Sequence, residues 1–150
     1  MKMSISLKSL LVVATLAFMT GCASVVPMAP KEQDSASKNF AAPTGNMAGV
    51  YIYRNSFVGK ALKKKLSIDN VVIGETANTV FFHKEVAPGE HTLSTESEFG
   101  ENVLKFSAEA GKNYYFQQYI KMGVFVGGSN IQAVSEEEGK QNVLQCHEAK

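Results

Sequence analysis

The sequence lacks an excess of charge of either sign. Its 150 residues include 15 Lys and Arg residues and 14 Asp and Glu residues, a formal net charge of +1. Removal of residues 1–21 would take away Lys2 and Lys8 and no acidic residue, which leaves a net charge of −1. Proteins that bind nucleic acid through its phosphates normally carry a clear basic excess. We therefore expect no nucleic acid among the partners of this chain.

Cysteine is scarce as well, with Cys22 and Cys146 alone. Cys22 follows a segment with the organisation of an export signal: two lysines, an apolar run over residues 10–19, and the small pair Thr20-Gly21. The apolar run is shorter than the roughly 20 residues that a permanent membrane-spanning helix needs. The pattern predicts a signal peptide over 1–21 that is removed before Cys22.

The segment Phe18-Met19-Thr20-Gly21-Cys22 resembles the lipobox of bacterial lipoproteins, although Leu is commoner where Met19 stands. The resemblance implies that the Cys22 thiol is diacylated and that the new N-terminus is then acylated. Each buried methylene contributes about 0.8 kcal/mol, so more than one acyl chain gives lasting attachment to a membrane. The alternative is a free or disulfide-bonded Cys22 behind an ordinary signal.

Ala23 bears on the destination, because Asp at that position resembles the inner-membrane retention signal of enteric bacteria. We therefore expect anchorage in the outer membrane, facing the periplasm, rather than in the inner membrane. With Cys22 lipidated, Cys146 has no partner within the chain. Two interpretations of Cys146 stay open, a partly buried thiol or an intermolecular disulfide.

Three regions follow from composition and periodicity. Residues 22–47 are rich in Ala, Ser, Pro, Lys and Asn and have no sustained period, which predicts a disordered tether behind the lipidated cysteine. Residues 48–150 carry short β-type segments separated by turn residues, which favours one antiparallel β-sandwich domain. The expected strands cover residues 48–54, 65–68, 71–73, 79–87, 90–98, 102–110, 113–122 and 129–134.

Turn and cap residues connect these strands. Asp69-Asn70 tolerates positive φ and predicts a tight hairpin, and Pro88-Gly89 predicts a second hairpin between the strands on either side of it. Ser135 to Glu138 has the spacing of a capping box, which predicts a short terminal helix, although Gly139 is a poor helix former.

Four segments together carry a resemblance: Ala48–Arg54, Ser67–Gly74, Val86–Leu93 and Ala108–Phe116. They resemble a family of uncharacterised proteobacterial lipoproteins, classed as a domain of unknown function. Their order is also similar to that of small transthyretin-like and PEGA-type sandwiches, except that Asn70 stands where the turn often carries Gly. The resemblance covers roughly residues 48–146 and implies a fold; it brings no catalytic residue.

A reaction centre is also missing from the sequence. No Gly-x-Ser-x-Gly turn or phosphate-binding glycine pattern occurs, and we expect no cofactor. Glu96 with Glu98, and residues 136–138, are interpreted as a solvated strand face and a favourable helix start. His83 and His91 invite a metal hypothesis, but pairing across a Pro88-Gly89 hairpin would put them on opposite faces, and no third ligand is near in sequence.

Two features suit binding. Lys60, Lys63, Lys64 and Lys65 are interpreted either as a contact for anionic lipid or as protection of an exposed edge strand. The stretch 122–128 is interpreted either as an exposed partner-binding loop or as a buried strand. The leading hypothesis is a non-enzymatic, lipid-anchored module that binds or organises an envelope protein or glycan. The alternatives are a small envelope hydrolase or enzyme inhibitor with an undisclosed pocket, and a purely structural or stress-related lipoprotein without a discrete ligand.

Overall fold

The computed structural model describes residues 25–150, so the predicted signal peptide and Cys22 lie outside the described residues. Helix α2 (Lys31–Ser37) comes first. The remaining elements are β1 (Ala48–Arg54), β2 (Lys64–Ile68), β3 (Val71–Thr76), β4 (Val80–Val86), β5 (Gly89–Ser97), β6 (Gly100–Ala108), β7 (Asn113–Lys121), β8 (Gly128–Val134), α3 (Glu136–Val143) and β9 (His147–Glu148).

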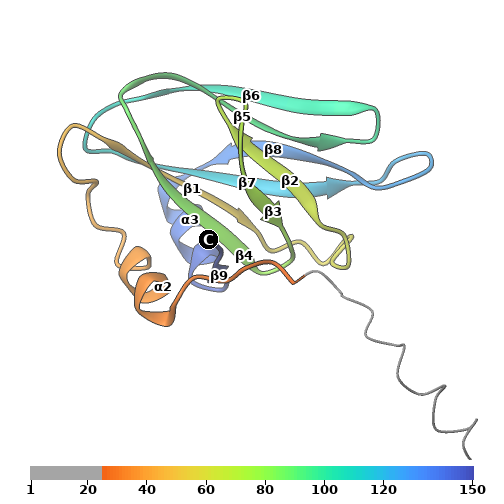
Figure 1. The fold of residues 1–150 in the computed structure, drawn as a ribbon, viewed down its shortest axis with the longest axis horizontal. Helices are drawn as coiled ribbons and strands as arrows, with labels where there is room; N and C mark the ends of the chain where they lie inside the picture. The colour runs from red at the N-terminus through yellow and green to blue at the C-terminus, as the bar shows by residue number, and fades with distance from the viewer. Residues whose placement is uncertain (1–24) are drawn as a thin grey trace, which may run out of the picture.

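The strands form two sheets, and the predicted β-sandwich with a short C-terminal helix is confirmed (Figure 1). One sheet has five strands in the order β8-β7-β1-β4-β9, and the other has four in the order β3-β2-β5-β6. Most neighbours are antiparallel, as expected. Two pairs, β1 with β7 and β4 with β9, are parallel.

Strand β1 is the centre of the structure because both of its faces are buried. Val50 and Ile52 point into the core between the sheets, whereas Tyr51 and Tyr53 belong to a second cluster with Val143 of α3. Successive strand residues point to opposite faces, so the alternation of aliphatic and aromatic residues in β1 supplies one core on each side of its sheet.

Helix α3 begins as predicted, with the Ser135 hydroxyl accepting a hydrogen bond from the Glu138 amide at 3.2 Å. The structure also explains why a glycine stands at position 139 inside this helix. A Cβ at this position would lie 2.3 Å from Cβ of Tyr115 in β7. The glycine lets the helix approach the sheet closely, which the helix-propensity argument alone did not reveal.

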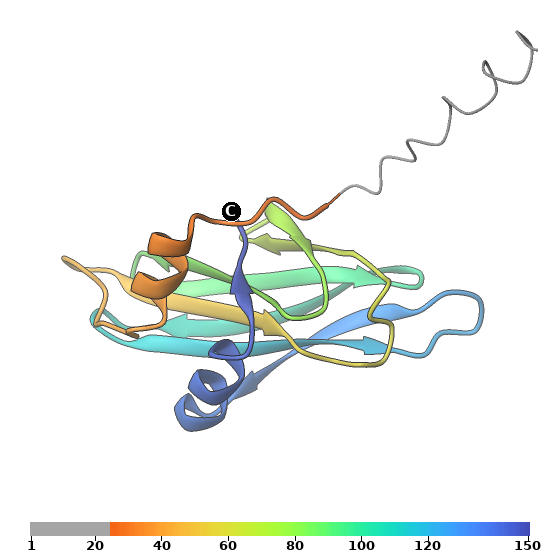
Figure 2. The ribbon, with the colours of Figure 1, turned by 90° about the horizontal axis from the view of Figure 1, so that it is seen from below.

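The tether predicted for residues 22–47 is wrong for the part that the structure describes. Residues 31–37 form α2, and Met28 forms an antiparallel bridge with Ala149 beyond β9. The Ala29 amide donates to the Glu148 carbonyl at 2.9 Å, and the Lys150 amide donates to the Pro27 carbonyl at 3.0 Å. Figure 2 shows this N-terminal segment lying against the domain beside the C-terminus. The ordered domain therefore begins near residue 26 rather than at 48.

The two predicted turns have different outcomes. Asp69 and Asn70 both adopt positive φ, 49° and 65°, and connect β2 to β3 as expected. The chain does turn after Val86, but β4 and β5 belong to different sheets, so the predicted hairpin across Pro88-Gly89 is wrong. This connection crosses from one layer of the sandwich to the other.

Among residues 25–150, neither helix has the length and apolar composition needed to cross a membrane.

Replacing Gly139 with Ala is expected to destabilise the protein although Ala is the better helix former. On an exposed helix position the change stabilises by up to about 1 kcal/mol, but here the added Cβ overlaps Tyr115, and overpacking typically costs about 1–3 kcal/mol. Urea unfolding of Gly139→Ala checks this, with Gln141→Ala at an exposed position of the same helix as the control. A Gly139→Ala protein as stable as the unchanged chain would contradict the close packing of α3.

Candidate interaction surface

Three loops gather at one end of the sandwich, at the right of Figure 1. They connect β1 to β2 (residues 55–63), β5 to β6 (residues 98–99) and β7 to β8 (residues 122–127). We call these residues the three-loop tip. Because β1 and β7 are parallel neighbours, their carboxyl ends bring two of the loops to the same end of the five-stranded sheet.

The three-loop tip exposes large apolar side chains. Phe57 is 81% exposed, Phe99 is 79% exposed and Phe125 is 82% exposed, one from each loop. The other exposed apolar residues of the tip are Val58, Met122, Val124 and Val126. Single exposed apolar residues are ordinary, whereas a group of them at one place is typical of an interaction site. Of the two interpretations of residues 122–128, the exposed loop is the one that the structure bears out.

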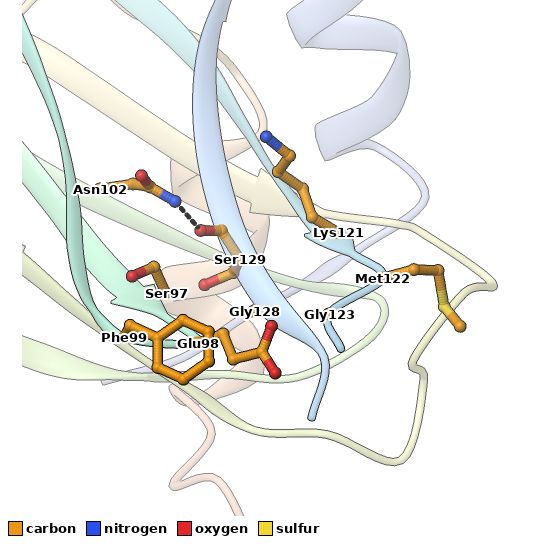
Figure 3. A pocket seen from close by; sticks show the side chains of 9 residues that line it. All are labelled: Ser97, Glu98, Phe99, Asn102, Lys121, Met122, Gly123, Gly128 and Ser129. Atoms are coloured by element: carbon orange, nitrogen blue, oxygen red, sulfur yellow. Dashed lines mark hydrogen bonds between the residues drawn. The ribbon is translucent and has the colours of Figure 1, made fainter. Parts of the chain in front are cut away.

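A single carboxylate fixes the β7–β8 loop. Glu98 accepts hydrogen bonds from the backbone amides of Val124, Phe125 and Val126, at 2.8, 2.5 and 3.2 Å. The bond from the Phe125 amide is the main reason that the pKa of Glu98 is held below its ordinary value of 4.5. A shallow pocket of about 220 Å³ lies beside this carboxylate, lined also by Phe99 and Met122 (Figure 3).

A buried cation holds the β1–β2 loop from the interior of the domain. Arg54 is fully buried and donates to the carbonyls of Gly59, at 2.5 Å, and Leu62, at 2.8 Å. Burial lowers the pKa of Arg54, because the charged form loses its solvation. The loop also packs against β7, where a Cβ at Gly59 would lie 2.8 Å from Ile120.

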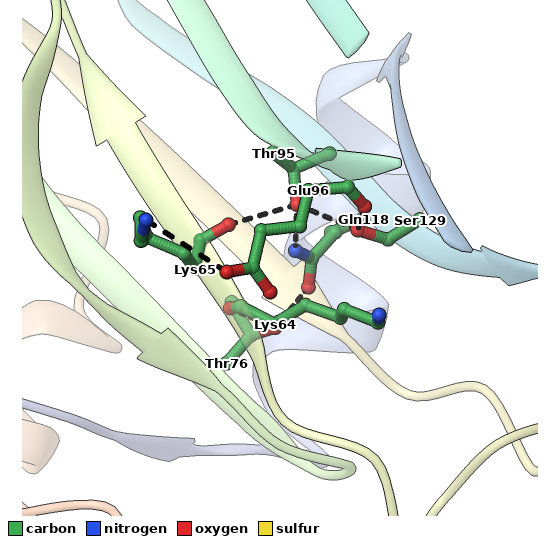
Figure 4. A network of polar contacts seen from close by, with 7 residues as sticks. All are labelled: Lys64, Lys65, Thr76, Thr95, Glu96, Gln118 and Ser129. Carbon is green, nitrogen blue, oxygen red and sulfur yellow. Dashed lines mark hydrogen bonds and ion pairs between the residues drawn. The ribbon is translucent and has the colours of Figure 1, made fainter. Parts of the chain in front are cut away.

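A buried polar network lies between the two sheets beneath the tip (Figure 4). The side-chain amide of Gln118 donates to the Thr95 hydroxyl at 2.6 Å, and its carbonyl oxygen accepts from the Thr76 hydroxyl. Thr95 and Ser129 hydroxyls are 2.7 Å apart. The network joins β3 and β5 of one sheet to β7 and β8 of the other. Because buried polar groups are costly unless paired, it fixes how the two sheets meet below the loops.

The lysine cluster flanks the same end. Lys60 lies 5.1 Å from the centre of the Phe57 ring, and Lys65 pairs with Glu96 at 3.8 Å. Lys64 and Lys65 belong to β2, which has β3 on one side and β5 on the other. Strand β2 is therefore an inner strand and not the expected edge strand, although its pairing with β5 covers Leu66 to Ile68 alone.

His83 lies in β4 and His91 lies in β5, and these strands belong to different sheets. The prediction that the two histidines lie on opposite faces of one hairpin is therefore wrong. The His83 ring stacks on Tyr51, with centroids 4.1 Å apart, and burial lowers its pKa. His91 contacts Asp69 at 2.6 Å through Nδ1, and this contact raises the pKa of His91. Among residues 25–150 no group of three His, Cys, Asp or Glu side chains is placed to hold a metal ion.

Cys146 is enclosed rather than partly buried. Its exposed fraction is 0%, and burial raises the pKa of the thiol to about 12. A thiol that is neither exposed nor ionised is a poor partner for an intermolecular disulfide. The geometry favours the buried-thiol interpretation.

Comparison with known proteins shows which family the chain belongs to. The model of a family described as "Protein of unknown function (DUF2846)" matches residues 44–129. The chain belongs to the DUF2846 family. It is also 49% identical, over 138 residues, to an "Uncharacterized protein" of Haemophilus influenzae, covering 92% of this chain and 82% of that one. No solved structure matches the chain.

The segment matched to DUF2846 contains the whole three-loop tip, whereas α2 and α3 lie outside it. Sequence reasoning found residues 122–128 and the lysines of this tip but missed Phe57, Phe99 and Glu98. Glu98 was interpreted as part of a solvated strand face. Its role depends on three amides more than 25 positions away in the chain, and no local spacing signals such a contact.

Glu98 is expected to titrate together with the loop that it holds. Its pKa is lowered in the folded protein, so the contact is present above the ordinary pKa and is lost as pH falls through the lower folded value. In an NMR titration the amides of Val124, Phe125 and Val126 should shift together with a midpoint below 4.5.

Glu98→Gln should abolish this shared transition, whereas Glu101→Gln, in the neighbouring strand β6, should preserve it. Three amides that titrate independently, or a transition that survives Glu98→Gln, would show that the carboxylate does not hold the loop.

Proposed function

We propose that this member of the DUF2846 family is a lipid-anchored envelope lipoprotein that acts as a non-enzymatic binding module. Cys22 carries the lipid, the outer membrane is its location, and the domain faces the periplasm. The three-loop tip is its binding surface. The observation that carries the proposal is the exposure of three phenylalanines, one from each loop, on loops that internal contacts hold in place.

The N-terminal sequence supports the anchor. A basic start, a short apolar run and the Met19-Thr20-Gly21-Cys22 segment form one continuous export and lipidation pattern. Attachment through acyl chains needs no membrane-spanning helix. The transthyretin-like resemblance concerns the fold and adds no argument for a partner.

The contacts that hold the loops of the tip in place support a role in binding a partner. Loops ordered before a partner arrives lose less conformational entropy on association than mobile loops do. Glu98 holds the β7–β8 loop, and Arg54 holds the β1–β2 loop. These contacts keep apolar side chains in water, an arrangement that folding alone does not favour.

The hydrolase alternative has one contact in its favour. The Ser37 hydroxyl lies 3.3 Å from Nδ1 of His83. Ser37 is only 8% exposed, however, and the imidazole is stacked on Tyr51. We assign this pair to the packing of α2 on the five-stranded sheet, and an activity screen with His83→Ala tests the enzyme proposal.

Cys22→Ser should prevent lipid attachment, because the thiol is the acceptor. In growing bacteria the variant is expected to take up no radiolabelled palmitate and to lose processing before residue 22. Cys146→Ser is the matched control and should be labelled and processed like the unchanged chain, because its thiol is enclosed. A Cys22→Ser chain that is still cleaved at the same bond and still fractionates with membranes would contradict the anchor.

A further inference from the structure

We propose that the three-loop tip inserts its exposed apolar side chains into the surface of the same bilayer that holds the acylated N-terminus. This inference rests on the proposed lipid anchor and names the partner of the binding surface as a lipid membrane. The chain between the acylated residue and the domain is short. Val25 is three positions after Cys22, and three fully extended residues span at most roughly 10–11 Å.

The direction of the N-terminal segment also favours contact between the tip and the bilayer. From α2 back toward Val25, the N-terminal segment runs toward the end of the sandwich that carries the three-loop tip, in both Figure 1 and Figure 2. Residues 27–29 are hydrogen-bonded to the end of the chain, so they cannot extend the short connection. An acylated Cys22 would therefore hold the domain to the bilayer by a short connection that leaves toward this end of the sandwich.

The side chains of the tip suit a bilayer surface. Three exposed phenylalanines with valine and methionine neighbours suit the boundary between headgroups and acyl chains. Backbone amides entering such a region need partners, and Glu98 supplies them for three successive residues of the β7–β8 loop. The carboxylate lies against the backbone of that loop, and Figure 3 shows it between Gly123 and Gly128.

Positive charge accompanies the apolar residues of the tip. Lys60 belongs to the β1–β2 loop, Lys64 and Lys65 begin β2, and Lys121 ends β7. These basic residues lie in the β1–β2 loop or at strand ends next to the tip, and anionic lipid headgroups attract lysines placed near the membrane surface. Lysines beside exposed apolar residues suit a bilayer surface that contains anionic lipid.

A fluorescent probe at the tip tests the inference on the full acylated chain. Phe125→Cys is labelled with an environment-sensitive dye, purified in detergent and reconstituted into vesicles of phosphatidylethanolamine and phosphatidylglycerol. Phe99→Cys provides a second tip position. Val71→Cys is the matched control, because Val71 is 66% exposed and begins β3, at the Asp69-Asn70 turn. Cys146 is enclosed and leaves the introduced thiol as the reactive one.

At both tip positions the emission should shift to shorter wavelength on reconstitution, and nitroxide-bearing lipids should quench it more strongly than at position 71. If the chain stays with the vesicles but the dye at positions 71, 99 and 125 shows the same water-like emission, the tip does not enter the bilayer. This result overturns the inference and leaves the proposed lipid anchor intact. A chain that does not stay with the vesicles overturns both. Shielding in whole envelopes but not in these vesicles identifies a protein partner and also overturns the inference.

Discussion

The pairing of residues 27–29 with the last residues of the chain is the constraint that fixes where the domain begins. Backbone hydrogen bonds from Ala29 to Glu148 and from Lys150 to Pro27 join the two ends of the domain. Gln33 and Asp34 of α2 then bind Glu148 through its carboxylate and its amide. This arrangement turns a polar N-terminal segment into part of the fold, and it leaves only residues 23–25 between the proposed lipid and the domain.

The same architecture explains how apolar loops persist in water. The parallel pairing of β1 with β7 directs two loops to one end, and contacts between the sheets fix the third beside them. Two polar side chains hold loops in place. Arg54 donates to carbonyls of the β1–β2 loop, and Glu98 accepts from amides of the β7–β8 loop. Apolar side chains are thereby left outside the cores and free for a partner.

Sequence patterns predicted the features that depend on residues close together in the chain. Alternation located the strands, Asp69-Asn70 marked its turn, and Ser135 marked the start of α3. The failures share one cause, which is contact between distant residues. Residues 25–47 have no periodicity of their own and are ordered by distant partners, among them Glu148, which is 115 positions from Gln33. Pro88-Gly89 likewise carries no signal for which sheet receives the next strand. The buried site of Gly139 against Tyr115 is of the same kind.

The distance between the domain and the membrane tests the central claim most directly. Neutron reflectometry of the acylated protein on a supported bilayer measures the water layer between headgroups and protein. An ordered N-terminal segment predicts a protein layer that begins within or directly at the headgroups, with no separating water layer. A water gap of roughly 25–30 Å, the separation that a flexible chain of some two dozen residues would give, would contradict the account.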